Sequence, residues 1–277
     1  MPRILIIDGN TAETRAKHVA VGGTASGDGY AATLKHLKPG IECDIVHPAD
    51  EDVKLPDGVS IADYAGAAIT GSALNIYSRE ASVERQIDLA KAVFAAGVPC
   101  FGSCWGLQVG VTAAGGSVVR NPRGREFGFG RRITLTSAGR DHAMFLGKPE
   151  VFEACTVHVD TVDSLPAGAT PLAHNDMGLQ AAEIKHKHGV FWGVQYHPEY
   201  SCAEIAAMAR RYGEVLIRDK LVNDQAELDE LSADLLALDH NPDDARLAWR
   251  FGVGPAITDA SVKLAELRNW LDKQVLK

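Results

Sequence analysis

The stretch Val98-Pro-Cys-Phe-Gly-Ser-Cys-Trp-Gly-Leu-Gln108 joins an apolar run to a glycine-flanked cysteine and then to a second apolar pattern. The run 98–101 predicts a strand buried on both faces, which is typical of a parallel sheet. The residues after Gly106 predict a helix. Cys104 lies between the two with a glycine two residues away on either side, which is the spacing of a nucleophile on a strand-to-helix turn. The glycines let neighbouring backbone approach a strained central residue closely.

A cysteine in this position is a candidate nucleophile. At the start of a helix, the positive end of the helix dipole favours the thiolate form of Cys104, which is the reactive form. The alternative is a structural cysteine buried in a tight turn. The glycine spacing favours the nucleophile, and a nucleophile needs a base together with a group that orients the base.

The segments before this turn alternate between apolar runs and amphipathic patterns. This alternation predicts an α/β fold: a doubly wound, mostly parallel, flavodoxin-like sheet flanked by helices on both faces. The predicted strands are 3–8, 42–47 and 64–72, and the predicted helices are 30–37 and 82–96. The glycine-rich connection 9–29, with a possible helix over 12–20, matches neither a P-loop nor a dinucleotide fingerprint, so we expect no cofactor.

From Gly116 the pattern changes to short strands and turns. These segments predict a small antiparallel sheet, and they are followed by a helix over 203–217. The predicted strands are 117–120, 131–136, 152–158 and a hairpin of 179–185 with 190–196. The hairpin turn His186-Lys-His188 has no third candidate ligand nearby, so we expect no metal site.

Residues 221–277 form a separate predicted unit, a helical C-terminal extension. The segment 225–238 is acidic and amphipathic, Asn241-Pro242 interrupts it, and 261–276 predicts a last helix. The extension covers the main domain or forms a surface for a partner or a second copy of the chain. The sequence leaves these alternatives open.

Composition limits the classes of partner. The net charge of −8 disfavours nucleic acid, which requires a basic surface. The five cysteines include no Cys-x-x-Cys pair, which predicts a reducing, cytoplasmic setting. No signal-peptide core and no apolar run of roughly 20 residues is present, so we expect no membrane association.

His197 is the best-placed base among the ten histidines. It directly follows the predicted strand 190–196, and Pro198 favours a turn after it. Glu199 lies near enough to hydrogen-bond the imidazole and fix its orientation, as an aspartate does in serine triads. An alternative role for Glu199 is to cap the following helix.

Together these motifs resemble the class I (triad) glutamine amidotransferases, especially the stand-alone, GMP-synthase-like glutaminase domains. The resemblance rests on the segment 102–108 and on Gly193-Val-Gln-Tyr-His-Pro-Glu199. Further similarity comes from Thr70-Gly71-Ser72, from 121–128 and from Val157-His-Val-Asp160. The resemblance covers 1–220, and it identifies that part as the amidotransferase-like domain and 221–277 as the extension.

The resemblance implies a role for each site residue. Cys104 would attack the side-chain amide of glutamine, His197 would move the proton, and Glu199 would orient His197. Backbone N–H groups of Gly71 and Trp105 would form the oxyanion hole. The expected substrate contacts are Gln108, Val159 and Asp160. Positions 157 and 159 carry valine where the synthase-type pattern has serine and glycine.

Three functions follow from these residues. The first is hydrolysis of glutamine through a γ-glutamyl thioester, with ammonia passed to an unknown acceptor such as a separate synthetase subunit, since no ATP-site motif is present. The second is a γ-glutamyl hydrolase acting on a γ-glutamyl amine or peptide. The third, a catalytically silent partner-binding module, is disfavoured by the complete set of candidate catalytic residues. Homo-oligomer formation stays open.

Overall fold

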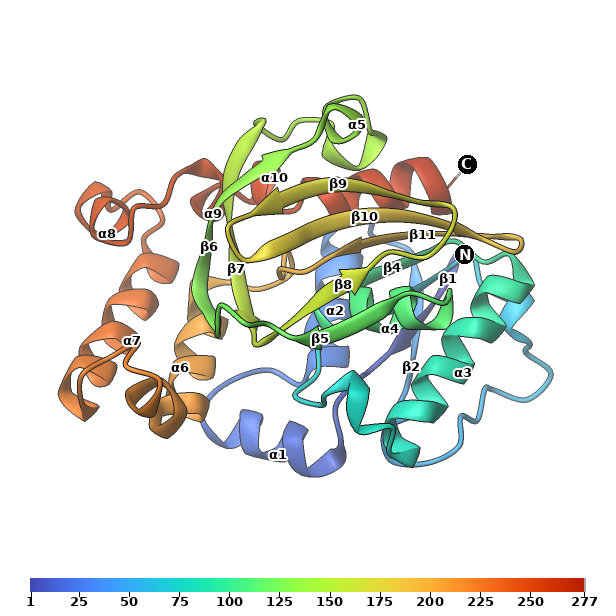
Figure 1. The fold of residues 1–277 in the computed structure, drawn as a ribbon, viewed down its shortest axis with the longest axis horizontal. Helices are drawn as coiled ribbons and strands as arrows, with labels where there is room; N and C mark the ends of the chain where they lie inside the picture. Colours follow the sequence, from blue (N-terminus) through green and yellow to red (C-terminus); the bar gives the residue numbers. More distant parts are fainter. Residues whose placement is uncertain (277) are drawn as a thin grey trace.

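Five parallel strands form one half of the main β-sheet in the computed structural model, which describes residues 1–276. They lie in the order β2-β1-β3-β4-β11, the 2-1-3-4-5 order of flavodoxin-like folds (Figure 1). The inner strands are buried on both faces because helices cover both sides of the sheet. The strands are β1 (Arg3–Ile7), β2 (Glu42–Val46), β3 (Gly66–Ile69), β4 (Cys100–Ser103) and β11 (Gly189–Val194).

The helices of this half lie on opposite faces of the sheet, so the predicted doubly wound α/β fold is confirmed. Tyr30 and Leu34 of α2 join the core cluster of one face, whereas α3 and α4 join the cluster of the other. The helix α2 begins at Ser26 rather than at residue 30, because the amide of Gly27 donates to Asp8 Oδ2 at 3.0 Å. The elements are α1 (Ala12–Ala20), α2 (Ser26–Leu37), α3 (Ala81–Ala96) and α4 (Trp105–Ala113), with 3₁₀ turns η1 (Ile61–Asp63) and η2 (Ile76–Ser78).

Antiparallel strands extend the sheet beyond β11 in the order β10-β9-β6-β7, and a separate two-stranded sheet pairs β5 with β8. The predicted hairpin is present as β10 and β11, whose last pair is His186 with Gly189. Two strands, β8 and β9, were not predicted, because β8 is short and polar and β9 contains Pro171. The elements are β5 (Ser117–Arg120), β6 (Glu126–Leu135), β7 (Val151–His158), β8 (Asp160–Ser164), β9 (Ala169–Asn175) and β10 (Gly178–His186), with α5 (Ser137–Arg140) and η3 (Ala143–Phe145).

The C-terminal part is helical, but the prediction of one continuous helix over 261–276 was wrong. The helix ends at Lys263 and resumes at Ala265. Lys148 Nζ donates to the carbonyl oxygens of Val262 and Lys263 at 3.2 and 3.3 Å, which takes these acceptors out of a regular helix. The elements are α6 (Cys202–Arg218), α7 (Gln225–His240), α8 (Ala245–Phe251), α9 (Pro255–Thr258), α10 (Ala260–Lys263), α11 (Ala265–Trp270) and a π-helical turn η4 (Leu271–Val275). Within 1–276 no helix is long and apolar enough to cross a lipid bilayer.

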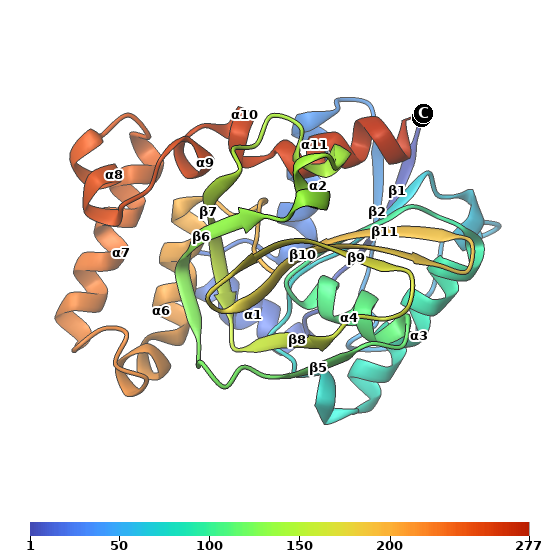
Figure 2. The same cartoon turned by 45° about the horizontal axis from the view of Figure 1, so that its top comes forward.

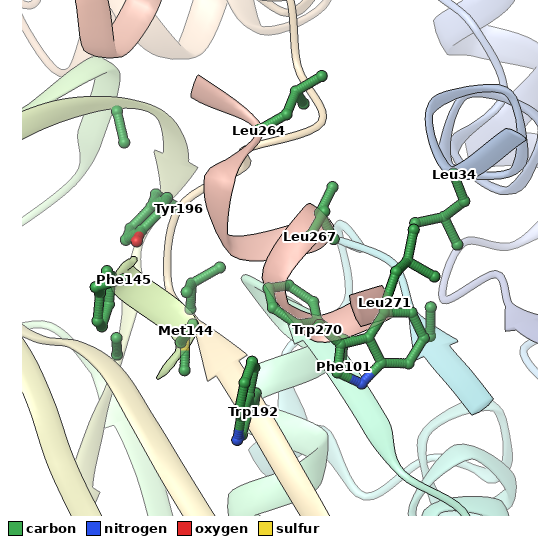
Figure 3. Close-up of a cluster of buried hydrophobic side chains, with 14 of the residues drawn as sticks. Leu34, Phe101, Met144, Phe145, Trp192, Tyr196, Leu264, Leu267, Trp270 and Leu271 are labelled. Carbon is green, nitrogen blue, oxygen red and sulfur yellow. The ribbon is translucent and has the colours of Figure 1, made fainter. Parts of the chain in front are cut away.

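The last helices cover the face of the sheet on which α2 lies. Figure 2 shows α11 beside α2, and Figure 3 shows Leu267, Trp270 and Leu271 among buried side chains of the main domain. The rings of Trp270 and Phe101 have centroids 5.9 Å apart, so the extension contacts the strand that leads to Cys104. Of the two alternatives for residues 221–277, this packing corresponds to covering the main domain. The division of the chain into two domains at residue 220 stays a prediction.

Candidate active site

Cys104 lies at the carboxyl end of β4 and directly before α4; Figure 1 labels both elements. Its backbone has φ 53° and ψ −102°, a strained conformation for a residue with a side chain. The Cys104 amide donates to Val194 O at 2.7 Å, which fixes the turn. A Cβ on Gly102 would lie 2.6 Å from the backbone of Gly106, and one on Gly106 would collide with the carbonyl oxygen of Ile69. The two glycines are therefore required by close backbone packing around the thiol.

The structure brings His197 and Glu199 to this turn. The strands β11 and β4 pair in parallel, with Val194 beside Ser103, so their carboxyl ends are neighbours. The His197 ring is buried and stacks on Tyr200 with centroids 3.9 Å apart and planes 4° apart. Nδ1 of His197 lies 2.7 Å from Glu199 Oε1. The ring is thus held on one side by a carboxylate and on one face by an aromatic ring.

The charge of the imidazole is set by its two neighbours. Burial on its own lowers the pKa of His197, but the charges of Glu199 and Cys104, and hydrogen bonds to both, raise the pKa to about 10. The ring therefore bonds the sulfur as well as the carboxylate, and it holds its proton at neutral pH. The Cys104 thiol lies beside this ring and donates to the carbonyl oxygen of Val157 at 3.7 Å.

Two further residues, which sequence reasoning missed, hold the carboxylate. Ser103 Oγ donates to Glu199 Oε2 at 3.0 Å, and the Tyr30 hydroxyl lies 3.0 Å from Ser103 Oγ. Because a serine has one hydroxyl proton, the Tyr30 hydroxyl donates to Ser103. The signal for Ser103 was its place beside the cysteine in the turn, whereas nothing local indicated Tyr30.

Gly71 lies against the imidazole, at the carboxyl end of β3. A Cβ at this position would lie 2.5 Å from His197 Cε1. The carbonyl oxygen of Gly71 accepts from Asn10 Nδ2 and Thr70 Oγ1, each at 3.0 Å, so this peptide has a fixed orientation. Asn10 was also missed; its signal was a polar side chain three residues after the end of a buried strand.

The N–H groups of Gly71 and Trp105 are both free to donate. The Gly71 amide makes no hydrogen bond within residues 1–276, and the Trp105 amide is the first of α4, where no intrahelical acceptor exists. The indole of Trp105 donates to Gln86 Oε1 at 2.7 Å, which anchors the start of the helix.

A cavity of about 220 Å³ opens beside the thiol. The expected substrate contacts Gln108, Val159 and Asp160 all line it together with Cys104. Gln108 Nε2 donates to Gln195 Oε1 at 3.3 Å, and the Tyr77 hydroxyl donates to Asp160 Oδ1 at 3.2 Å. Burial raises the pKa of Asp160, against the hydrogen bond from Tyr77 and the charge of Arg120.

Arginines that the sequence did not single out also line this cavity. They are Arg120 at the end of β5, Arg125 before β6 and Arg218 at the end of α6. They were missed because they come from β5, from the loop before β6 and from α6, which only the fold brings together. Among residues 1–276, no group of three or more His, Cys, Asp or Glu is placed to hold a metal ion.

The fold and the turn around Cys104 define a cysteine-nucleophile amidohydrolase, and comparisons with known proteins agree. The family model described as "Glutamine amidotransferase class-I" matches residues 31–211. The chain is 40% identical over 222 residues to a γ-glutamyl-L-1-hydroxyisopropylamide hydrolase from Pseudomonas sp., with 78% of this chain and 74% of that protein covered. This protein therefore belongs to the class I glutamine amidotransferase family.

Other relatives are glutamine-hydrolysing GMP synthases. The one from Wolinella succinogenes is 31% identical over 169 residues, which cover 61% of this chain and 30% of the synthase. The chain thus matches less than a third of the length of that enzyme. Among solved structures, a glutamine amidotransferase from Thermotoga maritima has a TM-score of 0.66 at 18% identity, covering 100% of this chain and 99% of that one. A glutamine amidotransferase from Methylobacillus flagellatus has a TM-score of 0.57 at 20% identity, covering 91% and 95%. These two structures show the shared fold.

Proposed function

We propose that this enzyme hydrolyses the amide bond of γ-glutamyl compounds, with Cys104 as the nucleophile, His197 as the acid and base, and Glu199 as the residue that orients His197. The observation that carries the proposal is the buried pairing of His197 with both Glu199 and Cys104 beside a cavity of about 220 Å³. A thiolate paired with an imidazolium is the reactive form of a cysteine nucleophile.

The reaction proceeds in two steps with one proton carrier. The sulfur of Cys104 bonds to the γ-carbonyl carbon, and the C–N bond then breaks while His197 gives its proton to the leaving nitrogen. The products of this step are a γ-glutamyl thioester and a free amine. In the second step, His197 takes a proton from water, the hydroxide attacks the thioester, and glutamate leaves as the thiolate re-forms.

The negative charge on the carbonyl oxygen in both steps is stabilised by the N–H groups of Gly71 and Trp105. Both amides are free to donate, and Asn10 and Thr70 hold the carbonyl oxygen of Gly71, in the next peptide along the chain. One oxyanion-hole donor contributes about 3 kcal/mol to transition-state stabilisation.

The cavity beside the thiol would hold the γ-glutamyl group. Asp160, with Tyr77, is suited to the α-ammonium group, and Gln108 and the backbone near Val159 complete the wall. The Pseudomonas relative hydrolyses a γ-glutamyl amide with a substituted amine, and this supports the same class of substrate here. All five cysteines are free thiols, and a reducing, cytoplasmic compartment stays a prediction.

Glutamine itself is the second candidate substrate. The similarity to glutamine-hydrolysing GMP synthases supports it. In that case ammonia would leave for an acceptor, and a separate synthetase subunit stays a prediction, as does assembly into a homo-oligomer. A steady-state comparison of glutamine with N-substituted γ-glutamyl amides separates the two candidates.

The test of the proposal is covalent labelling of the thiol combined with activity. A glutamine analogue carrying a diazoketone should alkylate the thiol of the wild type once, with loss of N2 and formation of a thioether, seen by intact-protein mass spectrometry and mapped to Cys104. Cys104→Ala should lose both labelling and hydrolysis, whereas Cys43→Ala, at a half-buried thiol on β2, should keep both. Hydrolysis that survives Cys104→Ala would disprove the proposal.

A further inference from the structure

A small hollow on the His197 side of the thiol is the place where the leaving group departs, if the proposed function holds. It has a volume of about 20 Å³, which is room for about one water molecule. His197 lines it, and the leaving nitrogen must come within hydrogen-bonding reach of that ring to receive a proton. Ser72, Ala73, Val157 and Tyr212 line both this hollow and the 220 Å³ cavity, so the two are contiguous. Met208, Arg211 and Tyr212 of α6 line the hollow, so a group attached to the nitrogen there would lie against this helix.

Arg211 of α6 is the charged residue at this exit. Apart from His197, the other residues that line the hollow are uncharged. Arg211 is partly buried, and its guanidinium carbon lies 5.0 Å from the centroid of the Tyr212 ring. Within residues 1–276 its guanidinium group makes no ion pair and no hydrogen bond. A half-buried guanidinium without a carboxylate is unusual in a chain of net charge −8.

Other charged residues around the cavity and the hollow are sufficient to bind the γ-glutamyl group, so Arg211 is not needed for that group. Arg125 and Arg218 both pair with Asp219, at 3.3 and 3.1 Å. A γ-glutamyl group carries one ammonium and one carboxylate. These match Asp160 and Arg120 in the larger cavity, and Arg120 forms no ion pair with any described residue. The positive charge of Arg211 remains, and it lies on the leaving-group side.

We infer that Arg211 binds a carboxylate on the leaving amine, so that the preferred substrates are γ-glutamyl amino acids or γ-glutamyl peptides. A guanidinium is suited to this because its parallel N–H groups fit a carboxylate. The inference rests on the proposed function and adds the chemistry of the leaving group to it.

Two substrates that differ in one group test this inference. γ-Glutamylalanine carries a carboxylate where γ-glutamyl-1-hydroxyisopropylamide carries a hydroxymethyl group, and the rest of the two molecules is the same. The wild type should have a kcat/KM at least about tenfold higher for γ-glutamylalanine than for the hydroxymethyl substrate, because only γ-glutamylalanine makes the charge-assisted contact with Arg211. Arg211→Gln should reduce that ratio to near one, and Arg211→Lys should retain part of it.

A matched control and a salt series separate recognition from a general loss of structure. Arg246→Gln, at an exposed arginine of α8, should keep the wild-type ratio. Raising the salt concentration from about 0.05 to 0.5 M should narrow the ratio in the wild type and not in Arg211→Gln. An unchanged ratio in Arg211→Gln, or a wild-type preference for the hydroxymethyl substrate, would overturn the role of Arg211 alone. Failure to hydrolyse either substrate, without labelling of Cys104, would overturn the proposed function as well.

Discussion

The thiol of Cys104 is held in place before any substrate arrives. Its positive φ costs about 1–3 kcal/mol, and the surrounding structure supplies this through the bond from its amide to Val194 and through the close packing of the two flanking glycines. The chain of hydrogen bonds from Tyr30 through Ser103 to Glu199 fixes the carboxylate in the same way. Nucleophile and base therefore need little rearrangement to react.

The raised pKa of His197 predicts where activity is lost at high pH. The ring must be protonated to give a proton to the leaving amine, so kcat/KM should be sustained below pH 10 and fall as pH rises through about 10. The sign follows from the charges of Glu199 and Cys104, which favour the protonated ring. Glu199→Gln removes one of these charges and should move the alkaline limb down by roughly 1–3 pH units.

The measurement is the pH profile of kcat/KM for one γ-glutamyl amide. Glu214→Gln, at an exposed glutamate on α6, is the matched control and should keep the wild-type limb. A limb that stays in place in Glu199→Gln would show that the carboxylate does not act on the charge of His197.

At the scale of secondary structure, activity depends on how closely α4 packs against β3. A methyl group on Gly106 would collide with the carbonyl oxygen of Ile69, and backbone cannot give way as a flexible side chain does. In Gly106→Ala, α4 must move away from β3 and carry Cys104 and the Trp105 amide with it. We expect kcat to fall about 100-fold, because a shift of about 1 Å is enough for such a loss, and stability to fall by about 1–3 kcal/mol.

Gly29→Ala is the control for this prediction. Gly29 lies within α2, and a Cβ there would meet its nearest neighbour, Thr24 Cγ2, at 3.6 Å. The free energy of unfolding of Gly29→Ala should be unchanged or higher by up to about 1 kcal/mol, since alanine favours a helix. Urea unfolding followed by circular dichroism, with kcat measured on the same samples, compares the variants. Wild-type kcat in a folded Gly106→Ala would contradict the packing argument.

Elements with strong local signals were predictable, and those that depend on distant contacts were not. The apolar runs and the glycine turn gave the parallel strands and the position of Cys104. Nothing local indicates that β9 continues the sheet in spite of Pro171, because that strand is stabilised by its neighbours. Likewise, the break between α10 and α11 depends on Lys148, which lies far away in the sequence.

The same distinction separates the parts of the candidate site. Cys104, His197 and Glu199 were named from motifs because each lies in the turn that follows a strand, where turn chemistry is visible in the sequence. Asn10 and Arg211 were not, since neither belongs to a motif and each reaches the site only through the order of strands and the placement of α6. Predicting them requires the fold first.

For the whole molecule, both halves of the sheet contribute to the site. The parallel half provides Cys104, Gly71 and Asn10 at the carboxyl ends of its strands, which is where flavodoxin-like sheets bind ligands. The antiparallel half provides β7, whose Cys155 carbonyl accepts from the His197 amide at 2.8 Å and whose end carries Val157 to the cavity. Catalysis therefore requires the entire sheet to be folded.

The packing of α11 extends this dependence to the C-terminal residues, and two tryptophans test it. Trp270 is fully buried against Phe101, whereas Trp249 of α8 is 86% exposed. Trp270→Ala leaves a cavity on the sheet and should lower the free energy of unfolding by about 3–5 kcal/mol, in one transition that abolishes activity and secondary structure together. Trp249→Ala should change the free energy of unfolding by less than about 0.5 kcal/mol.

Urea unfolding followed in parallel by circular dichroism and by hydrolysis distinguishes the outcomes. An early transition in Trp270→Ala that leaves activity intact would instead show that residues 221–277 unfold independently, as expected of a separate domain.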